Sequence, residues 1–328
     1  MIRVLLAEDS AVTREYLKWL LEQDPELEVV GAAPDGERAV ALAERLRPDV
    51  ILMDVHMPGL DGFDATRQIM ERFPTPIVMA TASTSRAFEA LEAGALVLLA
   101  KPPAPWEDGH EAAAEELLRT IKLMAEVKVV RRWADNGARR VRRPRAPRVV
   151  AIGASTGGPQ VLAAILGELP PLGVPVVLVQ HISLGFIEGF VEWLDSRAPM
   201  PVRIARHDDR LTPGTVYVAD GGHHVTLTRD RRIALDDGPP VNGFRPSISR
   251  LFDSVAETCG QAAVGVLLTG MGRDGADGLR RMRDAGALTI AQDEASSVVF
   301  GMPGEAVRLE AAVDVLPPAA ITETLRGL

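Results

Sequence analysis

Short apolar runs alternate with segments of helical periodicity in two separate stretches of the 328-residue chain. In the first stretch the runs are RVLLA, EVVGA, VILMD, PIVMA and LVLL, at residues 3–7, 28–32, 50–54, 76–80 and 96–99. Such alternation is typical of βαβ units, in which the strands of one sheet run parallel. It predicts a doubly wound α/β sheet, whose ligand site lies outside the carboxyl ends of the strands.

The alternation resumes at Arg148 and predicts a second parallel α/β domain, beginning with VVAIGAS, a helical segment and VPVVLVQH. Within this domain, apolar and polar residues alternate and turn signals recur over residues 215–237 (TVYVADGGHHVTLTRDRRIALDD). This pattern predicts an antiparallel hairpin addition. Between the two stretches, residues 131–148 hold eight arginines, one aspartate and two prolines, a composition typical of a solvated linker. We therefore expect domains at residues 1–122 and 148–328, joined by a basic linker at 123–147.

Composition excludes several classes of protein. The net charge of −9 argues against general nucleic-acid binding by the whole surface, although the basic linker could contact nucleic acid or an acidic partner. The single cysteine, Cys259, allows neither an intrachain disulfide nor a cysteine metal cluster, which fits a reducing compartment. The apolar stretches are too short for a membrane span, and Glu8 and Asp9 interrupt the first one. We expect a cytoplasmic protein without nucleic-acid partners or membrane insertion.

Polar side chains stand where four of the first domain's predicted strands end. They are Glu8 and Asp9 after the first strand, Asp54 at the third, Thr81 after the fourth and Lys101 after the fifth. Three carboxylates in one crevice repel each other unless a cation neutralises them, and an all-oxygen ligand set indicates Mg²⁺. Asp54 could then act as a nucleophile towards a phosphoryl donor, with Lys101 and the metal balancing the phosphoryl charge.

Three chemically complementary groups follow strands of the second domain. Ser155 ends the first strand in GASTGG, His181 ends the second in VQHI, and Asp274 follows the LLTG strand. A serine hydroxyl needs a base, and an imidazole needs an acid that fixes its tautomer, so these groups could form a hydrolytic triad. Asp277 is an alternative acid. Backbone amides near Thr156 and Met271 could stabilise an oxyanion.

The glycine-rich GASTGG segment also permits a phosphate-binding interpretation. It lacks the lysine of a P-loop, and Ser155 replaces the second glycine of Gly-x-Gly-x-x-Gly. His181 stands where a dinucleotide-binding domain would place its ribose-binding acid. The order Ser, His, Asp also differs from the Ser, Asp, His order of α/β-hydrolases, so Gly-x-Ser-x-Gly does not by itself assign that superfamily.

Residues 1–122 resemble a response-regulator receiver domain, which has a flavodoxin-like fold. The resemblance rests on AEDS, MDVHMPGLDG, ATA and AKPP. It implies that Asp54 accepts phosphate from a histidine kinase and that Glu8 and Asp9 help it to hold Mg²⁺. It further implies that Thr81 and Lys101 contact the phosphoryl group. Leu98 stands where receivers often carry an aromatic switch residue, so the strength of phospho-activation is left open.

Residues 148–328 resemble the catalytic domain of chemotaxis protein-glutamate methylesterases. The motifs are GASTGGP, VLVQHI, YVADGGHHVTL, FRPSISRLFDSVA, GVLLTGMGRDGADGL and TIAQDEASSVVFGMP. The resemblance implies that Ser155 is the nucleophile, His181 the base and Asp274 the orienting acid, with Thr156 and Met271 at the oxyanion and substrate-binding positions. It implies hydrolysis of glutamate γ-methyl esters on chemoreceptors and deamidation of receptor glutamines, with Mg²⁺ used only in the receiver domain and no cofactor for the esterase.

Two other functions fit parts of the sequence. A response regulator whose second domain binds DNA would share the first domain, but the second shows no helix-turn-helix pattern. A receiver-controlled hydrolase of a different ester or amide would share the whole pattern, because motifs do not reveal the surface that faces the substrate.

Overall fold

The computed structural model describes residues 1–81, 88–127, 147–183 and 185–328. They divide into two compact units, residues 1–130 and 131–328. Most of the predicted linker, 123–147, lies outside the described residues, and its boundaries stay a prediction. Helix α5 continues through residue 122 to Ala125.

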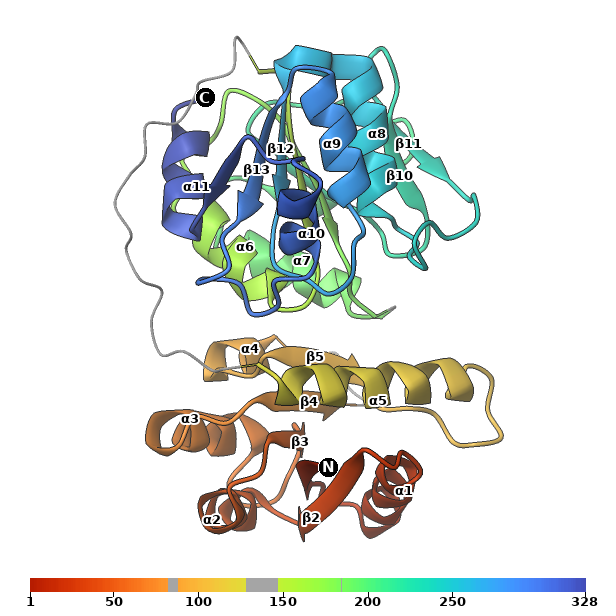
Figure 1. Ribbon diagram of the computed structural model, residues 1–328, viewed down its shortest axis with the longest axis vertical. Coiled ribbons are helices and arrows are strands. Elements are labelled where there is room, and N and C mark those ends of the chain that lie inside the picture. Colours follow the sequence, from red (N-terminus) through yellow and green to blue (C-terminus); the bar gives the residue numbers. More distant parts are fainter. Residues whose placement is uncertain (82–87, 128–146, 184) are drawn as a thin grey trace. The chain divides into compact units, whose positions relative to one another are not determined.

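The first unit is a five-stranded parallel sheet in the order β2-β1-β3-β4-β5. Its strands are β1 (Ile2–Ala7), β2 (Leu27–Ala33), β3 (Val50–Asp54), β4 (Ile77–Thr81) and β5 (Val97–Ala100). Its helices are α1 (Ala11–Glu22), α2 (Gly36–Leu46), α3 (Gly62–Arg72), α4 (Glu89–Ala93) and α5 (His110–Ala125). Helices α1 and α5 cover one face, and α2, α3 and α4 cover the other (Figure 1). The strand order reverses between β1 and β3, which opens a crevice at their carboxyl ends.

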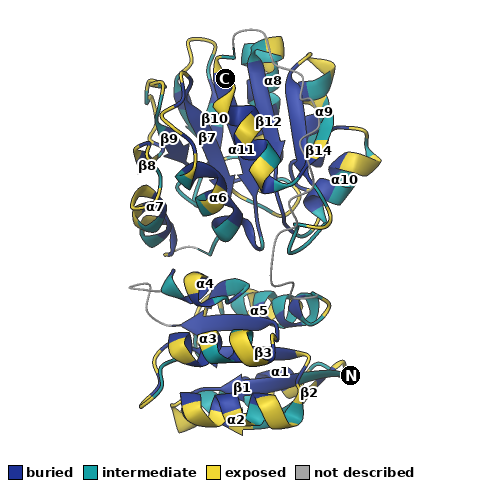
Figure 2. Ribbon diagram, turned by 90° about the vertical axis from the view of Figure 1, so that its left-hand side faces the viewer, coloured by how far each residue is buried: buried dark blue, intermediate teal, exposed yellow. Residues whose placement is uncertain are grey.

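Local sequence sets where these helices begin. Ser10, Asp35 and Asp61 are the N-caps of α1, α2 and α3, and each side chain accepts a hydrogen bond from a backbone amide of the first turn. Strands β3 and β4 are buried along their whole length because helices cover both faces of the sheet (Figure 2). Rigid strands therefore carry the polar residues at their ends.

The second unit contains a seven-stranded parallel sheet in the order β14-β13-β12-β6-β7-β9-β8. Its strands are β6 (Val149–Ala154), β7 (Val176–Gln180), β8 (Val202–Ile204), β9 (Val216–Val218), β12 (Ala263–Leu267), β13 (Leu288–Gln292) and β14 (Asp314–Leu316). Its helices are α6 (Gly158–Gly167), α7 (Ile187–Asp195), α8 (Ile248–Cys259), α9 (Ala276–Asp284), α10 (Met302–Arg308) and α11 (Pro318–Arg326), with a 3₁₀ turn at Gly260–Ala262. In this sheet β7 lies next to β6 on one side, and β12 lies next to β6 on the other side. The strand order therefore reverses at β6, and a second crevice opens between the carboxyl ends of β6 and β12.

The predicted hairpin at residues 215–237 is only partly present. Strands β10 (His224–Leu227) and β11 (Ile233–Asp236) form an antiparallel pair, as expected. Strand β9, from the start of the same segment, instead joins the large sheet parallel to β7 and β8. All residues of β9 are buried, and a short strand that is apolar on both faces is stable inside a parallel sheet covered by helices.

The predicted fold of two parallel α/β domains is confirmed. The core of the second unit unites the large sheet with α8, α9 and α10 and with the β10–β11 pair. None of the described helices combines the length and the apolar composition needed to cross a bilayer.

Candidate active site

Ser155 directly follows β6, at the reversal of strand order in the second unit. Its backbone amide donates to the carbonyl oxygen of Thr269, which lies in the loop after β12, over a distance of 3.0 Å. Gly270 approaches so closely that a Cβ atom there would lie 2.6 Å from the Cβ of Ser155. The loop after β12 therefore has room only for a glycine at position 270, beside the serine side chain. Ser155 itself is 8% exposed.

His181 stands beside Ser155 because β6 and β7 are parallel neighbours. Their register pairs Ala154 with Gln180, so the next pair along the ladder is Ser155 and His181. Adjacent strands lie about 4.8 Å apart, and residues in register point to the same face. The amide of His181 donates to the carbonyl oxygen of Ala154 over 2.9 Å, which extends the ladder to the site. The predicted convergence of these two residues is thus present in the backbone.

The side-chain amide of Gln180 joins the two residues further. Its Nε2 donates to the carbonyl oxygens of both Ser155, at 2.9 Å, and His181, at 2.7 Å. Gln180 is itself buried at the end of β7. One amide group therefore fixes the positions of both backbones.

Asp274 is the acid in contact with the imidazole. Its Oδ2 lies 3.1 Å from Nε2 of His181, and its side chain is fully buried. The alternative acid, Asp277, forms an ion pair with Arg273 on the surface of α9, with 2.7 Å between nitrogen and oxygen. The structure therefore brings Asp274 to His181 and directs Asp277 elsewhere.

His181 and the first turn of α8 together keep Asp274 ionised. The carboxylate accepts hydrogen bonds from Ser247 Oγ at 2.8 Å and from the amides of Ile248 and Ser249 at 2.7 and 3.1 Å. Burial alone raises the pKa of Asp274, but the hydrogen bond and charge of His181 and the donors of α8 outweigh it and lower that pKa to about 2. A carboxylate held in this way fixes the orientation of the imidazole.

The second ring nitrogen of His181 is the one available to Ser155. Nδ1 is buried and makes no hydrogen bond within the described part of the chain. Because Nε2 faces an ionised carboxylate, the neutral ring carries its proton on Nε2 and its lone pair on Nδ1. The arrangement can accept a proton from a neighbouring hydroxyl at Nδ1.

Thr156 and Met271 lie in the two loops that enclose Ser155. Thr156 precedes α6, and Met271 follows Gly270. The carbonyl oxygen of Thr156 accepts a 2.9 Å hydrogen bond from Thr269 Oγ1, which ties one loop to the other. Neither backbone amide donates to another described residue. Both amides are therefore without an acceptor among the described residues.

Three contributors to the site were not predicted from sequence. They are Phe244, whose ring stacks on His181, Gln180, and Ser247, the N-cap of α8. Phe244 and Ser247 belong to the FRPSISR segment, which carried the family resemblance without an assigned role. A serine followed by an amphipathic helix is a recognisable N-cap signal, but a lone Phe or Gln carries no comparable signal.

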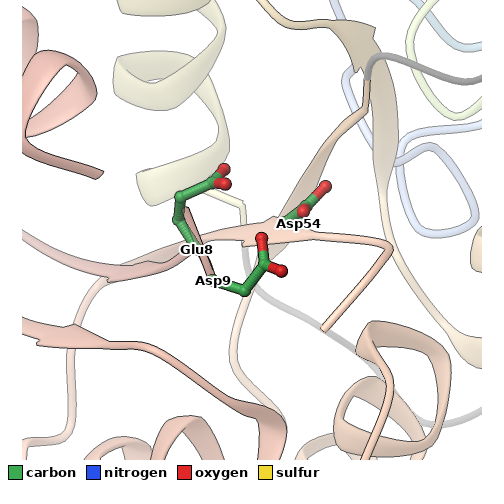
Figure 3. A group of neighbouring side chains, drawn as sticks. All are labelled: Glu8, Asp9 and Asp54. Atoms are coloured by element: carbon green, nitrogen blue, oxygen red, sulfur yellow. The ribbon is translucent and has the colours of Figure 1, made fainter. Parts of the chain in front are cut away.

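The acidic cluster of the first unit has the predicted composition. Glu8, Asp9 and Asp54 each place a carboxylate oxygen within 4.8 Å of the others, and Figure 3 shows the three side chains at the ends of their strands. Octahedral Mg²⁺ binds oxygens at about 2.0–2.1 Å, so ligand oxygens on opposite sides of the ion lie about 4.2 Å apart. The cluster therefore fits Mg²⁺ in chemistry, and its 4.8 Å limit is only slightly wider than this spacing.

Lys101 balances the charge of this cluster. Its Nζ lies 2.7 Å from Glu8 and 2.9 Å from Asp54. Burial raises the pKa of Glu8, and the hydrogen bond and charge of Lys101 oppose this rise only in part. Burial lowers the pKa of Lys101, but its bonds to the two carboxylates outweigh burial, so this pKa is raised. The lysine remains a cation beside the position expected to receive phosphate.

Thr81 and Leu98, the remaining receiver residues singled out from the sequence, lie on β4 and β5. Thr81 is buried at the end of β4, and its carbonyl oxygen accepts a 3.2 Å hydrogen bond from the amide of Lys101. Leu98 is buried in β5, where its backbone pairs with Met79. Residues 82–87, which follow Thr81, are outside the described residues.

Comparison with known proteins identifies both units. The family model described as response regulator receiver domain matches residues 4–113, and that described as CheB methylesterase matches residues 150–325. Together with the two crevices, these matches define a response regulator with a hydrolytic second domain. The chain belongs to the CheB methylesterase family. The prediction of a receiver domain joined to a protein-glutamate methylesterase is confirmed.

Curated relatives match this chain over its whole length. The protein-glutamate methylesterase/protein-glutamine glutaminase 4 of Geobacter metallireducens is 48% identical, over 100% of this chain and 99% of its own length. The corresponding protein of Nitrosospira multiformis is also 48% identical, over 100% and 97%. The crystal structure of the Thermotoga maritima CheB methylesterase catalytic domain is 35% identical, with a TM-score of 0.53, and the match covers 55% of this chain and 98% of that one.

Proposed function

We propose that this chain hydrolyses glutamate γ-methyl esters on the cytoplasmic helices of chemoreceptors and releases methanol. The observation that carries the proposal is the hydrogen bond between His181 and the buried carboxylate of Asp274, next in register to Ser155. The names of the relatives, which span nearly their full lengths, supply the substrate class. They also support deamidation of receptor glutamines, in which ammonia replaces methanol as the leaving group.

In the proposed mechanism Ser155 Oγ attacks the ester carbonyl carbon while its proton passes to Nδ1 of His181. Asp274 holds the Nε2 proton and stabilises the imidazolium that forms. The amides of Thr156 and Met271 donate to the tetrahedral oxyanion. When the intermediate collapses, the leaving methoxide takes the proton from Nδ1 and departs as methanol. Water then attacks the acyl-enzyme with His181 as base, which regenerates Ser155 and releases the glutamate carboxylate.

We infer that phosphorylation of Asp54 by a chemotaxis histidine kinase regulates this reaction. The support is the receiver match, the Mg²⁺-compatible cluster and the contact between Lys101 and Asp54. Mg²⁺ bound by Glu8, Asp9 and Asp54 would neutralise the incoming phosphoryl oxygens, and Thr81 and Lys101 would contact them once transferred. Asp54→Asn should therefore lose the increase in esterase rate that a small phosphodonor produces in the wild type, while its basal rate is retained.

The hydrolase proposal is tested with receptor membranes that carry radiolabelled methyl esters. Wild type should release labelled methanol, and Ser155→Ala should be slower by at least about a thousandfold. Ser196→Ala is the matched control, because this exposed serine caps the end of α7 and lies outside the site. Equal release by wild type and Ser155→Ala would contradict the proposal.

A further inference from the structure

A tight turn at residues 241–244 places an aromatic ring against the catalytic imidazole. Asn242 and Gly243 both have left-handed backbones, with φ of 54° and 84°. The amides of Val241 and Phe244 each donate to the other's carbonyl oxygen over 3.0 Å. Two left-handed central residues between such a pair define a type I′ turn, for which Asn-Gly is the preferred sequence. The turn is therefore held by its own hydrogen bonds, and Phe244 leaves it in a fixed direction.

The ring of Phe244 lies face to face with His181. The ring centroids are 3.9 Å apart and the planes differ by 6°. Aromatic pairs usually prefer offset or edge-to-face geometries with centroids about 4.5–7 Å apart, so this stack is unusually close. Phe244 therefore covers one face of the imidazole, while Asp274 contacts its edge.

The same segment also contacts the carboxylate. Nδ2 of Asn242 lies 3.4 Å from Oδ1 of Asp274, and Ser247, shortly after Phe244, donates to the same oxygen. Residues 242–247 thus reach both His181 and its acid. The stacked ring and the donors to the carboxylate come from one continuous segment of backbone.

The arginines next in sequence to Phe244 and to Asp274 make contacts of their own. Arg245, next to Phe244, donates to the carbonyl oxygens of Asp237 and Gly238. Arg273, next to Asp274, is paired with Asp277. A proton arriving on His181 therefore meets an ionised carboxylate at the ring edge and the electron-rich face of Phe244. An aromatic face stabilises a cation placed over it.

We propose that Phe244 is a positioning residue for His181, fixing the plane of the imidazole and stabilising the imidazolium formed during ester hydrolysis. This inference rests on the proposed function for its kinetic consequence. The stack itself exists without substrate, so its effect on His181 can be measured independently of turnover.

Phe244→Leu keeps an apolar side chain and removes the π face, whereas Phe244→Trp keeps a π face. Phe244→Leu should lower kcat about 2- to 30-fold with little change in KM, and Phe244→Trp should restore most of the rate. Loss of the π face disfavours the imidazolium, so the acid limb of kcat/KM should move to lower pH. Phe252→Leu is the control, because Phe252 is a fully buried core residue of α8. This variant should lower the melting temperature and leave the acid limb of the kcat/KM profile at its wild-type pH.

A second readout does not depend on activity. The Cε1 proton of His181, assigned by comparison with His181→Gln, should titrate at lower pH in Phe244→Leu than in wild type and recover in Phe244→Trp. If the wild type releases no methanol, the proposed function fails, and this titration alone decides the role of Phe244. The inference is overturned if Phe244→Leu titrates His181 as the wild type does, or if Leu and Trp variants behave alike.

Discussion

The carboxylate of Asp274 accepts a 2.7 Å hydrogen bond from the backbone amide of Ile248, the first residue of α8. The carboxylate that contacts the imidazole of His181 therefore also satisfies the amino end of a helix that packs against the large sheet. The positive end of the helix dipole favours a negative charge at this position. The same contact serves the chemistry and the stability of the second unit.

The hydrogen bonds that Asp274 accepts from His181 and from α8 predict how stability depends on pH. The pKa of Asp274 is lowered from 3.8 to about 2, so its ionised form stabilises the folded state above about pH 4, and this contribution is lost as the pH falls through 2. The free energy of unfolding of the wild type should exceed that of Asp274→Asn by a margin that shrinks by about 2 kcal/mol between pH 5 and pH 2. Urea unfolding, followed by the fluorescence of Trp193 in α7, measures this margin.

A single tryptophan in α7 reports the unfolding of the second unit within the full chain. Trp19, Trp106 and Trp133 are replaced by Phe in both proteins, which leaves Trp193 as the one tryptophan of the sequence. Carboxylates common to both proteins titrate equally and cancel in the difference. A margin that stays constant across this pH range would show that His181 and α8 do not hold Asp274 ionised.

Gly270→Ala should disable the site through packing alone. The added Cβ would lie 2.6 Å from both the Cβ of Ser155 and the sulfur of Met302, so the serine or its loop must move. A displacement of about 1 Å from reactive geometry can cost about a hundredfold in rate. Gly173→Ala is the matched control, because nothing lies within 4 Å of its Cβ position and its φ is not left-handed. Methanol release at wild-type rate from Gly270→Ala would contradict the close packing.

Gln180→Met should separate positioning from stability. The change removes the donor shared by the carbonyl oxygens of Ser155 and His181, which should cost about 1–3 kcal/mol of stability and also lower kcat. Gln292→Met removes a comparable buried bridge, between the amide of Thr269 and Ser296. Gln292 bonds neither Ser155 nor His181 directly, although Thr269 accepts a hydrogen bond from the amide of Ser155. Melting temperatures should fall similarly in both variants, with the larger loss of kcat in Gln180→Met. Equal losses of kcat would assign Gln180 a purely structural role.

Lys101→Met should tighten Mg²⁺ binding to the receiver cluster by about tenfold. The ammonium group contacts Glu8 and Asp54, so its removal leaves more negative charge for the metal to neutralise. Lys122→Met is the matched control, because Lys122 also pairs with two carboxylates, Asp24 and Glu26, away from the cluster. Calorimetric titration with MgCl₂ measures both affinities. Weaker or unchanged binding by Lys101→Met would contradict this electrostatic account.

Sequence alone predicts the parts of the fold that follow from periodicity. The apolar runs locate β1 to β5, and the rule for parallel sheets places Glu8, Asp54 and Lys101 together at one edge. The same rule brings Ser155 to His181, because each directly follows a buried strand. These inferences succeed because strand ends are local features and the geometry of parallel sheets is general.

Other features depend on contacts between distant segments. Asp274 and Asp277 are three residues apart and share a glycine-rich context, and only the donors at the start of α8 distinguish them. The contact of Nε2 of His181 with Asp274, which leaves Nδ1 without a hydrogen bond among the described residues, likewise requires the folded loops. Strand β9 was misplaced because its apolar run suits either a hairpin or a buried parallel strand.

The Asn242–Gly243 turn has a practical consequence for protein engineering. The two hydrogen bonds between Val241 and Phe244 hold the turn by itself. Residues 241–244 could therefore be exchanged between family members without changing the large sheet or the β10–β11 pair. Libraries limited to position 244 would vary the ring above the imidazole while leaving the backbone register intact. Such libraries offer a way to tune the working pH of the esterase by altering one side chain.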